Sequence, residues 1–199
     1  MTRWKPDAHG RLVKAALELF REQGFDTTTV AQIAERAGLT ERTFFRYYAD
    51  KREVLFWGGH LLEAMMTDAV AKAPPALLPM ATIGLALTTA AEATPWQVEA
   101  SRERHAVIYA HAELRERELL KLAGLGAALA KALHARGVKE PAASLAAEAG
   151  IAVFKVGFER WISAAKPKPI VHYMHEGLAE LQAVVGGISK PKARIKAAR

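Results

Sequence analysis

Two arginines, a threonine and an aromatic residue lie close together between positions 40 and 48, and their side chains are suited to contacting nucleic-acid bases. In a helix over this segment, Phe44 and Tyr48 share a face with Leu39, which makes that face the side that packs inward. The outward face then carries Arg42, Thr43, Phe45 and Arg46. Guanidinium groups pair with the edge of guanine, and an aromatic ring contacts the methyl group of thymine. The pattern indicates a base-reading helix; a solvated helix with one stray aromatic ring is the plainer interpretation.

Groups that bind phosphate flank this segment. Thr29, Thr40 and Tyr47 carry hydroxyls that can donate to phosphate oxygens, and the first amides of the helices expected after the two threonines point the same way. Each threonine is explained equally well as a helix cap. Lys51 and Arg52 are expected in the first turn of a helix, where the helix dipole disfavours cations. A nearby DNA phosphate would offset that cost.

Two helices are predicted before the base-reading segment. An apolar stripe at helical spacing predicts a helix over residues 7–23 that ends at Gly24. Thr29 and Gln32 have the spacing of a capping box, which predicts a short second helix over residues 29–38. The glycine at its end provides a tight turn into the next helix.

Two further helices are predicted after that turn. Thr40 caps a third helix over residues 40–47, and Asp50 with Glu53 predicts a long fourth helix that ends before Pro74. Two short helices joined by a tight turn and flanked by supporting helices match the helix-turn-helix arrangement, whose second helix enters the major groove of DNA.

Three motifs in this region make the sequence similar to the TetR family of regulators. They are Phe25-Asp26-Thr27-Thr28-Thr29-Val30, Ile33-Ala34-Glu35-Arg36-Ala37-Gly38 and Thr43-Phe44-Phe45-Arg46-Tyr47-Tyr48, followed by Lys51, and the resemblance covers residues 8–68. It implies that Thr29, Thr40 and Tyr47 contact phosphates. The same role is implied for Lys51, and base reading for the exposed residues of the third helix. Tyr48 departs from the family, in which phenylalanine is more usual, and a buried phenol needs a hydrogen-bond partner.

Strand signals are scarce along the whole chain, whereas alanine, leucine and charged residues recur at helical spacing. We therefore expect an all-α protein. Residues 1–56 are predicted to form the helix-turn-helix domain, with the motif at about 29–48. The long fourth helix joins it to a helical bundle for ligand binding and dimerisation over residues 57–185. A basic tail over residues 186–199 is expected to be disordered.

Two helices near the C-terminus are candidates for a dimer interface. The helix expected over residues 141–165 is apolar nearly all round, and the last helix carries an apolar stripe. The residues in question are Ile151, Val153, Phe154, Val156, Phe158, Trp161 and Ile162 in the first helix, and Ile170, Met174, Gly177, Leu178, Leu181 and Val185 in the second. Pairing both with their symmetry mates gives a four-helix homodimer interface. A single large core is the alternative.

A ligand cavity is expected in the C-terminal half, where aromatic walls combine with a few polar groups. The candidate residues are Trp96, Arg102, His105, Tyr109, Phe154 and Phe158. Ordinary core packing is the alternative for each of them. Residues 102–133 and 158–161 resemble the family's subgroup with an acyl-CoA-like ligand domain, which implies a long hydrophobic or acyl-type effector.

Composition excludes several classes of protein. The chain has no cysteine, which rules out a disulfide framework and a cysteine-liganded zinc site and fits a reducing cytoplasm. No stretch reads as a signal peptide or a membrane span, so we expect a cytoplasmic protein with no membrane partner; the alanine-rich residues 76–93 are expected to form a core helix. Most of the net charge of +7 comes from the tail.

The predicted function is a ligand-responsive repressor that binds double-stranded, pseudo-palindromic operator DNA as a homodimer and leaves it when a small effector binds. An effector-responsive activator is the alternative within the same class. A helical enzyme is a weaker alternative, because His172 and His175 lack a third metal ligand at a useful spacing. A nonspecific binder that relies on the basic tail is another. We expect no metal and no cofactor.

Overall fold

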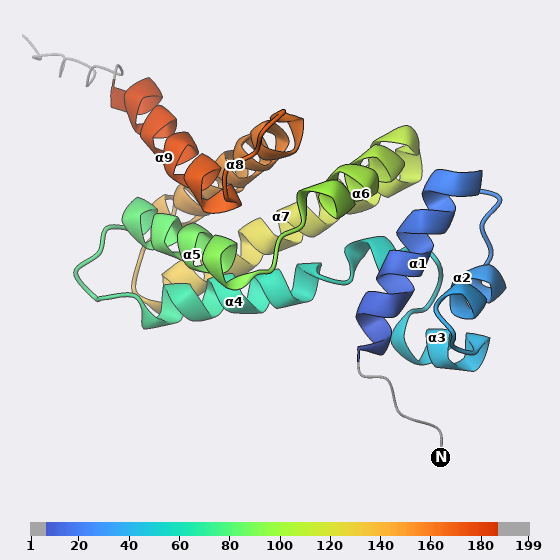
Figure 1. Cartoon of the computed structure of the whole chain (residues 1–199). Coiled ribbons are helices and arrows are strands. Elements are labelled where there is room, and N and C mark those ends of the chain that lie inside the picture. Colours follow the sequence, from blue (N-terminus) through green and yellow to red (C-terminus); the bar gives the residue numbers. More distant parts are fainter. Residues whose placement is uncertain (1–6, 187–199) are drawn as a thin grey trace, which may run out of the picture.

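The chain folds into α-helices joined by short turns (Figure 1). The computed structural model describes residues 7–186, and within that range there is no β-strand, which confirms the all-α prediction. The helices are α1 (Ala8–Gln23), α2 (Val30–Arg36), α3 (Glu41–Tyr47), α4 (Gly59–Lys72), α5 (Pro79–Ala93), α6 (Val98–Ala110), α7 (Ala112–Ala135), α8 (Ala142–Ser163) and α9 (Ile170–Gly186). None of these helices is long and apolar enough to cross a membrane. The predicted basic tail lies, from residue 187 onward, outside the described residues.

Helices α2 and α3 begin at the predicted caps, and α1 begins after a cap that was not predicted. The Asp7 side chain accepts a hydrogen bond from the amide of Gly10. Thr29 and Gln32 form the complete capping box, and Thr40 accepts from the amide of Thr43 at 3.2 Å. The caps of α2 and α3, which have seven residues each, satisfy amides that would otherwise lack partners and so help to stabilise these short helices.

The predicted long fourth helix is wrong in its first part. The segment after Asp50 forms a 3-10 turn, η1 (Glu53–Phe56), and the α-helix begins only at Gly59. The Asp50 carboxylate still caps the turn by accepting from the amides of Arg52 and Glu53. Two successive glycines, Gly58 and Gly59, weaken helix propagation at the break.

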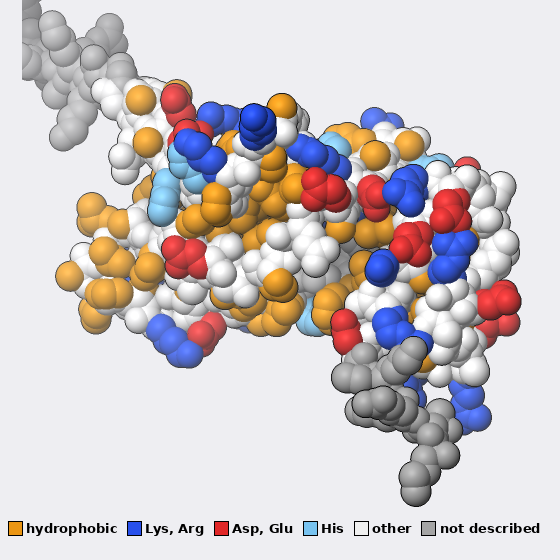
Figure 2. All heavy atoms as spheres, viewed as in Figure 1, with side chains coloured by type: hydrophobic (Ala, Val, Ile, Leu, Met, Phe, Trp, Pro, Cys, Tyr) orange, Lys and Arg blue, Asp and Glu red, His pale blue; other side chains and the backbone are white. Residues whose placement is uncertain are grey.

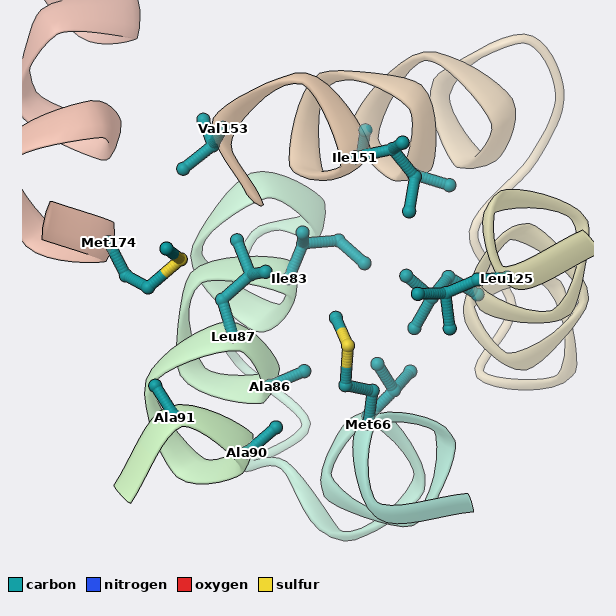
Figure 3. Packing of buried hydrophobic residues seen from close by; sticks show 14 of the residues in the cluster. Met66, Ile83, Ala86, Leu87, Ala90, Ala91, Leu125, Ile151, Val153 and Met174 are labelled. Carbon is teal, nitrogen blue, oxygen red and sulfur yellow. The ribbon is translucent and has the colours of Figure 1, made fainter. Parts of the chain in front are cut away.

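The C-terminal helices pack around one hydrophobic core (Figure 3). Its largest fully buried members come from α4, α5, α7 and α9, and they are Met66, Val70, Ile83, Leu87, Leu129, Leu133 and Met174. Helix α8 closes the core with Ile151 and Val153. The helices predicted over residues 76–93 and 141–165 correspond to α5 and α8, and the predicted last helix is α9.

A second core lies under α1, α2 and α3, and the corner between α6 and α7 completes it. Ile108 and Leu114, on either side of that corner, are 1% and 0% exposed within it. Figure 1 shows α6 and α7 running from the C-terminal bundle to α1. The contact between the two halves is therefore made by α6 and α7, and not by a continuous fourth helix.

Three glycines allow α8 to approach its neighbours closely. A Cβ on Gly150 would lie 2.3 Å from Cγ2 of Ile83 in α5, and one on Gly157 would lie 3.1 Å from the carbonyl oxygen of Tyr173 in α9. Gly177 of α9 faces Val153 in the same way. The axes of α5, α8 and α9 thus come together at positions where no side chain fits.

We expect Gly150→Ala to lower the free energy of unfolding by about 1–3 kcal/mol, because the new methyl group overlaps a fully buried isoleucine. Gly124→Ala is the matched control, since a Cβ on Gly124 in α7 would have no neighbour within 4 Å among the described residues. It should raise the free energy of unfolding by about 0.5–1 kcal/mol through helix propensity. Urea unfolding of both variants measures the difference, and equal effects would contradict the packing described.

Candidate nucleic-acid interface and ligand site

Helix α3 divides its residues between the core and the surface as its sequence predicts. Phe44 is 0% exposed and Tyr48, at the end of the helix, is 4% exposed. Among the outward residues, Phe45 is 55% exposed, Arg42 and Arg46 are exposed, and Thr43 is half-buried. The described part of the chain leaves this phenylalanine largely uncovered beside two exposed guanidinium groups, as a surface that contacts DNA bases requires.

The hydroxyl groups predicted to face phosphate lie at the helix starts and at the end of α3. Thr29 and Thr40 are exposed, and both serve as caps. The hydroxyl oxygen of Tyr47 accepts a hydrogen bond from Nη2 of Arg46 at 3.1 Å. Because that bond uses an acceptor lone pair, the phenolic hydrogen of Tyr47 stays available to donate to a phosphate oxygen.

Lys51 makes contacts that its sequence position did not indicate. Its ammonium group donates to the carbonyl oxygens of Phe25, Asp26 and Thr28 at 2.6, 3.0 and 2.9 Å. These three bonds use all three of its donors. Lys51 therefore holds the turn between α1 and α2 against the segment after α3, and phosphate attraction by its charge stays a prediction.

Lys51 and Arg52 do not lie in the first turn of an α-helix, so the prediction that a helix dipole disfavours their charges is wrong. Arg52 pairs instead with the carboxylate of Asp50 at 2.6 Å. That ion pair gives Arg52 a local role at the start of η1.

Two residues of α1 support α3 and the turn before it, and no sequence motif indicated either. Arg11 donates to the carbonyl oxygens of Ala37 and Gly38, in the turn that joins α2 to α3. The Nδ1 atom of His9 lies 3.2 Å from the hydroxyl of Tyr48, which is the partner that the buried phenol needs. Burial raises the pKa of Tyr48 and lowers the pKa of His9.

The residues predicted to line a ligand cavity form a chain of aromatic contacts between α6 and α8. The rings of Phe154 and Phe158 lie 6.4 and 6.3 Å from that of Trp96. His105 lies 6.2 Å from Phe158 and stacks on Tyr109 at 4.0 Å. Five of the six predicted residues are thus brought together. Desolvation of the His105 ring lowers its pKa, so its neutral form is favoured here.

Arg102, the sixth, lies beside this cluster but holds the end of α8. It donates to the carbonyl oxygens of Ile162 and Ala164, both at 2.6 Å. A guanidinium group at a helix C-terminus satisfies carbonyls that lack helical partners. Arg102 is therefore explained by capping without a ligand.

The cavity that borders the aromatic cluster is small. A cavity of about 10 Å³ lies between α4, α5, α8 and α9, with Trp96 and Phe154 in its wall. This volume holds one water molecule at most. The buried Nε1 donor of Trp96 has no hydrogen-bond partner in the described part of the chain. A larger ligand would enter only after these rings move apart.

Both halves of the chain match models of known protein families. The model for bacterial regulatory proteins of the tetR family matches residues 12–56, and that for the MftR C-terminal domain matches residues 77–186. The HTH-type transcriptional regulator TcmR of Streptomyces glaucescens is 54% identical over 44 residues, which are 22% of this chain and 20% of that protein. The matched segment thus spans about a fifth of that curated relative.

Two solved structures are similar over nearly the whole chain. One is Thermus thermophilus FadR, a TetR family transcriptional repressor in complex with lauroyl-CoA, with a TM-score of 0.54 and 22% identity over 96% of this chain and 100% of that one. The other is the regulator FadR from Bacillus subtilis in complex with stearoyl-CoA, with a TM-score of 0.58 and 18% identity over 91% of this chain and 100% of that one. At these identities the likeness shows the fold.

We expect Arg46→Ala to weaken binding to DNA from the promoter beside the protein's own gene by about 1–3 kcal/mol, because the guanidinium group predicted to read a base is lost. Tyr47→Phe should weaken binding through loss of one phosphate contact. Lys131→Ala, an exposed cation on α7, is the control and should leave the affinity unchanged. Fluorescence anisotropy over a salt series measures all three. Binding that ignores both DNA sequence and the first two substitutions would contradict the assigned interface.

Proposed function

Because the chain belongs to the TetR family of bacterial regulatory proteins, with an N-terminal helix-turn-helix and an MftR-type C-terminal domain, we propose that it is a ligand-released repressor. It is a DNA-binding transcriptional regulator and not an enzyme. The observation that carries the proposal is the exposed face of α3. Arg42, Phe45 and Arg46 are exposed on this face, while the neighbouring Phe44 is fully buried. In this proposal α3 enters the major groove of a pseudo-palindromic operator.

The proposed interface assigns a kind of contact to each exposed group. Arg42, Thr43, Phe45 and Arg46 meet base edges. Thr29, Thr40 and Tyr47 meet phosphates and fix the register of α3 in the groove. Lys51 supports the interface through the turn that it clamps, and its charge adds to phosphate attraction.

A homodimer is proposed because α8 and α9 leave apolar side chains uncovered. Leu145 and Val156 of α8 are 66% and 52% exposed, and Val184 and Val185 of α9 are 71% and 50% exposed. Leu145 and Val156 are eleven residues apart and thus lie on one side of α8. Figure 2 shows many hydrophobic side chains over the C-terminal bundle, with charged side chains along its upper edge and over the N-terminal part. A second copy of this chain covers the α8 and α9 faces in a four-helix arrangement.

We propose an acyl-type effector for the C-terminal bundle. The two FadR structures, which share this fold, hold lauroyl-CoA and stearoyl-CoA. The aromatic cluster of this chain offers an apolar lining that suits a hydrocarbon chain. Because the cavity beside Trp96 and Phe154 is so small, binding there separates the two rings, and the effector thereby selects a different arrangement of the bundle.

Helix α6 is the proposed route from the effector to α3. Two adjacent residues of α6 each contact a different half of the chain. His105 faces Phe158 of the C-terminal bundle, and Arg104 donates to the carbonyl oxygen of Leu55 in η1, in the DNA-binding half. The same guanidinium group forms two hydrogen bonds with Glu118, at 3.1 and 2.7 Å. A shift of α6 that makes room beside Phe158 therefore also moves the support of the DNA-binding half.

Lauroyl-CoA is expected to raise the dissociation constant for operator DNA at least about tenfold, because it binds the released arrangement more tightly. Coenzyme A without an acyl chain is the control and should have no effect. Phe158→Ala, within the aromatic cluster, should change the acyl-CoA concentration needed for release while leaving DNA binding intact. Operator titrations with and without each compound test this. Equal affinity with and without every acyl-CoA tested would contradict an acyl effector.

We expect Leu145→Glu with Val156→Glu to give a monomer in sedimentation velocity, because paired carboxylates in an apolar interface lose their hydration. DNA affinity should fall with dimerisation, since one half-site is then contacted at a time. Leu120→Glu is the matched control: Leu120 is also 66% exposed but lies on α7, and this variant should stay dimeric. A dimeric double variant would show that another surface pairs the subunits.

A further inference from the structure

Four aromatic rings meet where α1, α3 and the segment before α4 come together, and His9 is at their centre. Its ring lies 4.2 Å from the ring of Tyr47 and stacks on Trp57 at 4.5 Å with an angle of 29° between the planes. Its Nδ1 atom lies 3.2 Å from the hydroxyl of Tyr48. His9 thus contacts Tyr47 at the end of α3, Tyr48 directly after it, and Trp57 in the segment that leads to α4.

Tyr47 also contacts the DNA-facing side of α3. The guanidinium carbon of Arg46 lies 4.9 Å from the centre of the Tyr47 ring, and Nη2 of Arg46 donates to the Tyr47 hydroxyl. The position of the Tyr47 ring therefore decides where its own hydroxyl lies and where the Arg46 side chain is held. Both groups belong to the proposed DNA interface.

Helix α3 needs an external support at this end. It has seven residues and ends at Tyr47, and Tyr48 already has an extended backbone. A helix this short frays at its last turn unless side chains outside it hold it. Tyr47 is half-buried, and among its ring contacts the one that comes from another helix is His9.

We propose that His9 is a positioning residue for DNA recognition, whose ring fixes Tyr47 and thereby the Tyr47 hydroxyl and the Arg46 guanidinium group at the DNA surface. The tilted ring contact with Tyr47, at 4.2 Å between the ring centres, does the positioning. The hydrogen bond with Tyr48 orients the His9 ring itself. The inference rests on the proposed DNA contacts of Arg46 and Tyr47.

Two variants separate the ring contact with Tyr47 from the hydrogen bond with Tyr48. His9→Asn keeps a polar atom near Nδ1 but removes the ring, so operator affinity should fall about tenfold, equivalent to about 1.4 kcal/mol. His9→Phe combined with Tyr48→Phe keeps a ring against Tyr47 and removes both members of the hydrogen bond, so no buried hydroxyl is left alone. This double variant should stay within about twofold of the wild type.

A double-mutant cycle shows whether His9 acts through Tyr47. In a Tyr47→Phe background the hydroxyl is already absent, so His9→Asn should weaken operator binding less than it does in the wild type. A role of His9 in stability alone would weaken binding equally in both backgrounds. Equal effects, or loss of affinity in the folded His9→Phe, Tyr48→Phe variant, would overturn the proposal.

A measurement without DNA tests the same contact. The chain has four tyrosines, so the ring resonances of ¹³C-labelled tyrosine can be assigned one by one. The Tyr47 resonances should move in His9→Asn and stay near their wild-type positions in the His9→Phe, Tyr48→Phe variant. Unchanged Tyr47 resonances in His9→Asn would overturn the positioning role. Failure of the wild type to bind promoter DNA would instead count against the proposed function, and the two failures are therefore distinguishable.

Discussion

The burial of Phe44 is the constraint on which the rest of the DNA-binding half depends. A helix of seven residues does not hold its shape in water, so the direction of α3 comes from what its inner face packs against. Phe44 is fully buried in the N-terminal core, and its burial turns Arg42, Phe45 and Arg46 outward together. Around it, Arg11 and Lys51 hold the neighbouring turns by donating to backbone carbonyls.

The same core connects α3 to the C-terminal bundle. Its inner wall includes Ile108 and Leu114, so the α6–α7 corner is part of the DNA-binding half as well as of the bundle. Charged groups add contacts between η1 and the helices α6 and α7. Arg117 of α7 pairs with Glu53, and the guanidinium carbon of Arg104 in α6 lies 5.5 Å from the centre of the Phe56 ring. A change in the position of α6 therefore changes the surface on which α1 and η1 rest. This shared core provides the physical connection that the proposed release by a ligand requires.

Local sequence patterns predict the elements and faces well, and distant contacts poorly. Caps such as Thr29 and Thr40 depend on residues three positions away, so their spacing is visible in the sequence. The roles of Lys51 and His9 depend on partners 23 to 39 positions away, which no local period reveals. The fourth helix is predicted too long because Asp50 and Glu53 have the spacing of a capping box, which indicates a helix start. Gly58 and Gly59, which delay the start of the α-helix, are a weaker signal in the sequence.

The central claim is that α3 of each subunit reads one half of a two-fold operator, and a hydroxyl-radical footprint on promoter DNA tests it most directly. The account predicts two protected regions on one face of the duplex, related by two-fold symmetry and centred about one helical turn apart, roughly 34–36 Å. Protection should weaken in both regions together when the subunits are separated. Uniform protection without two-fold spacing, or a single protected region at saturation, would contradict the account.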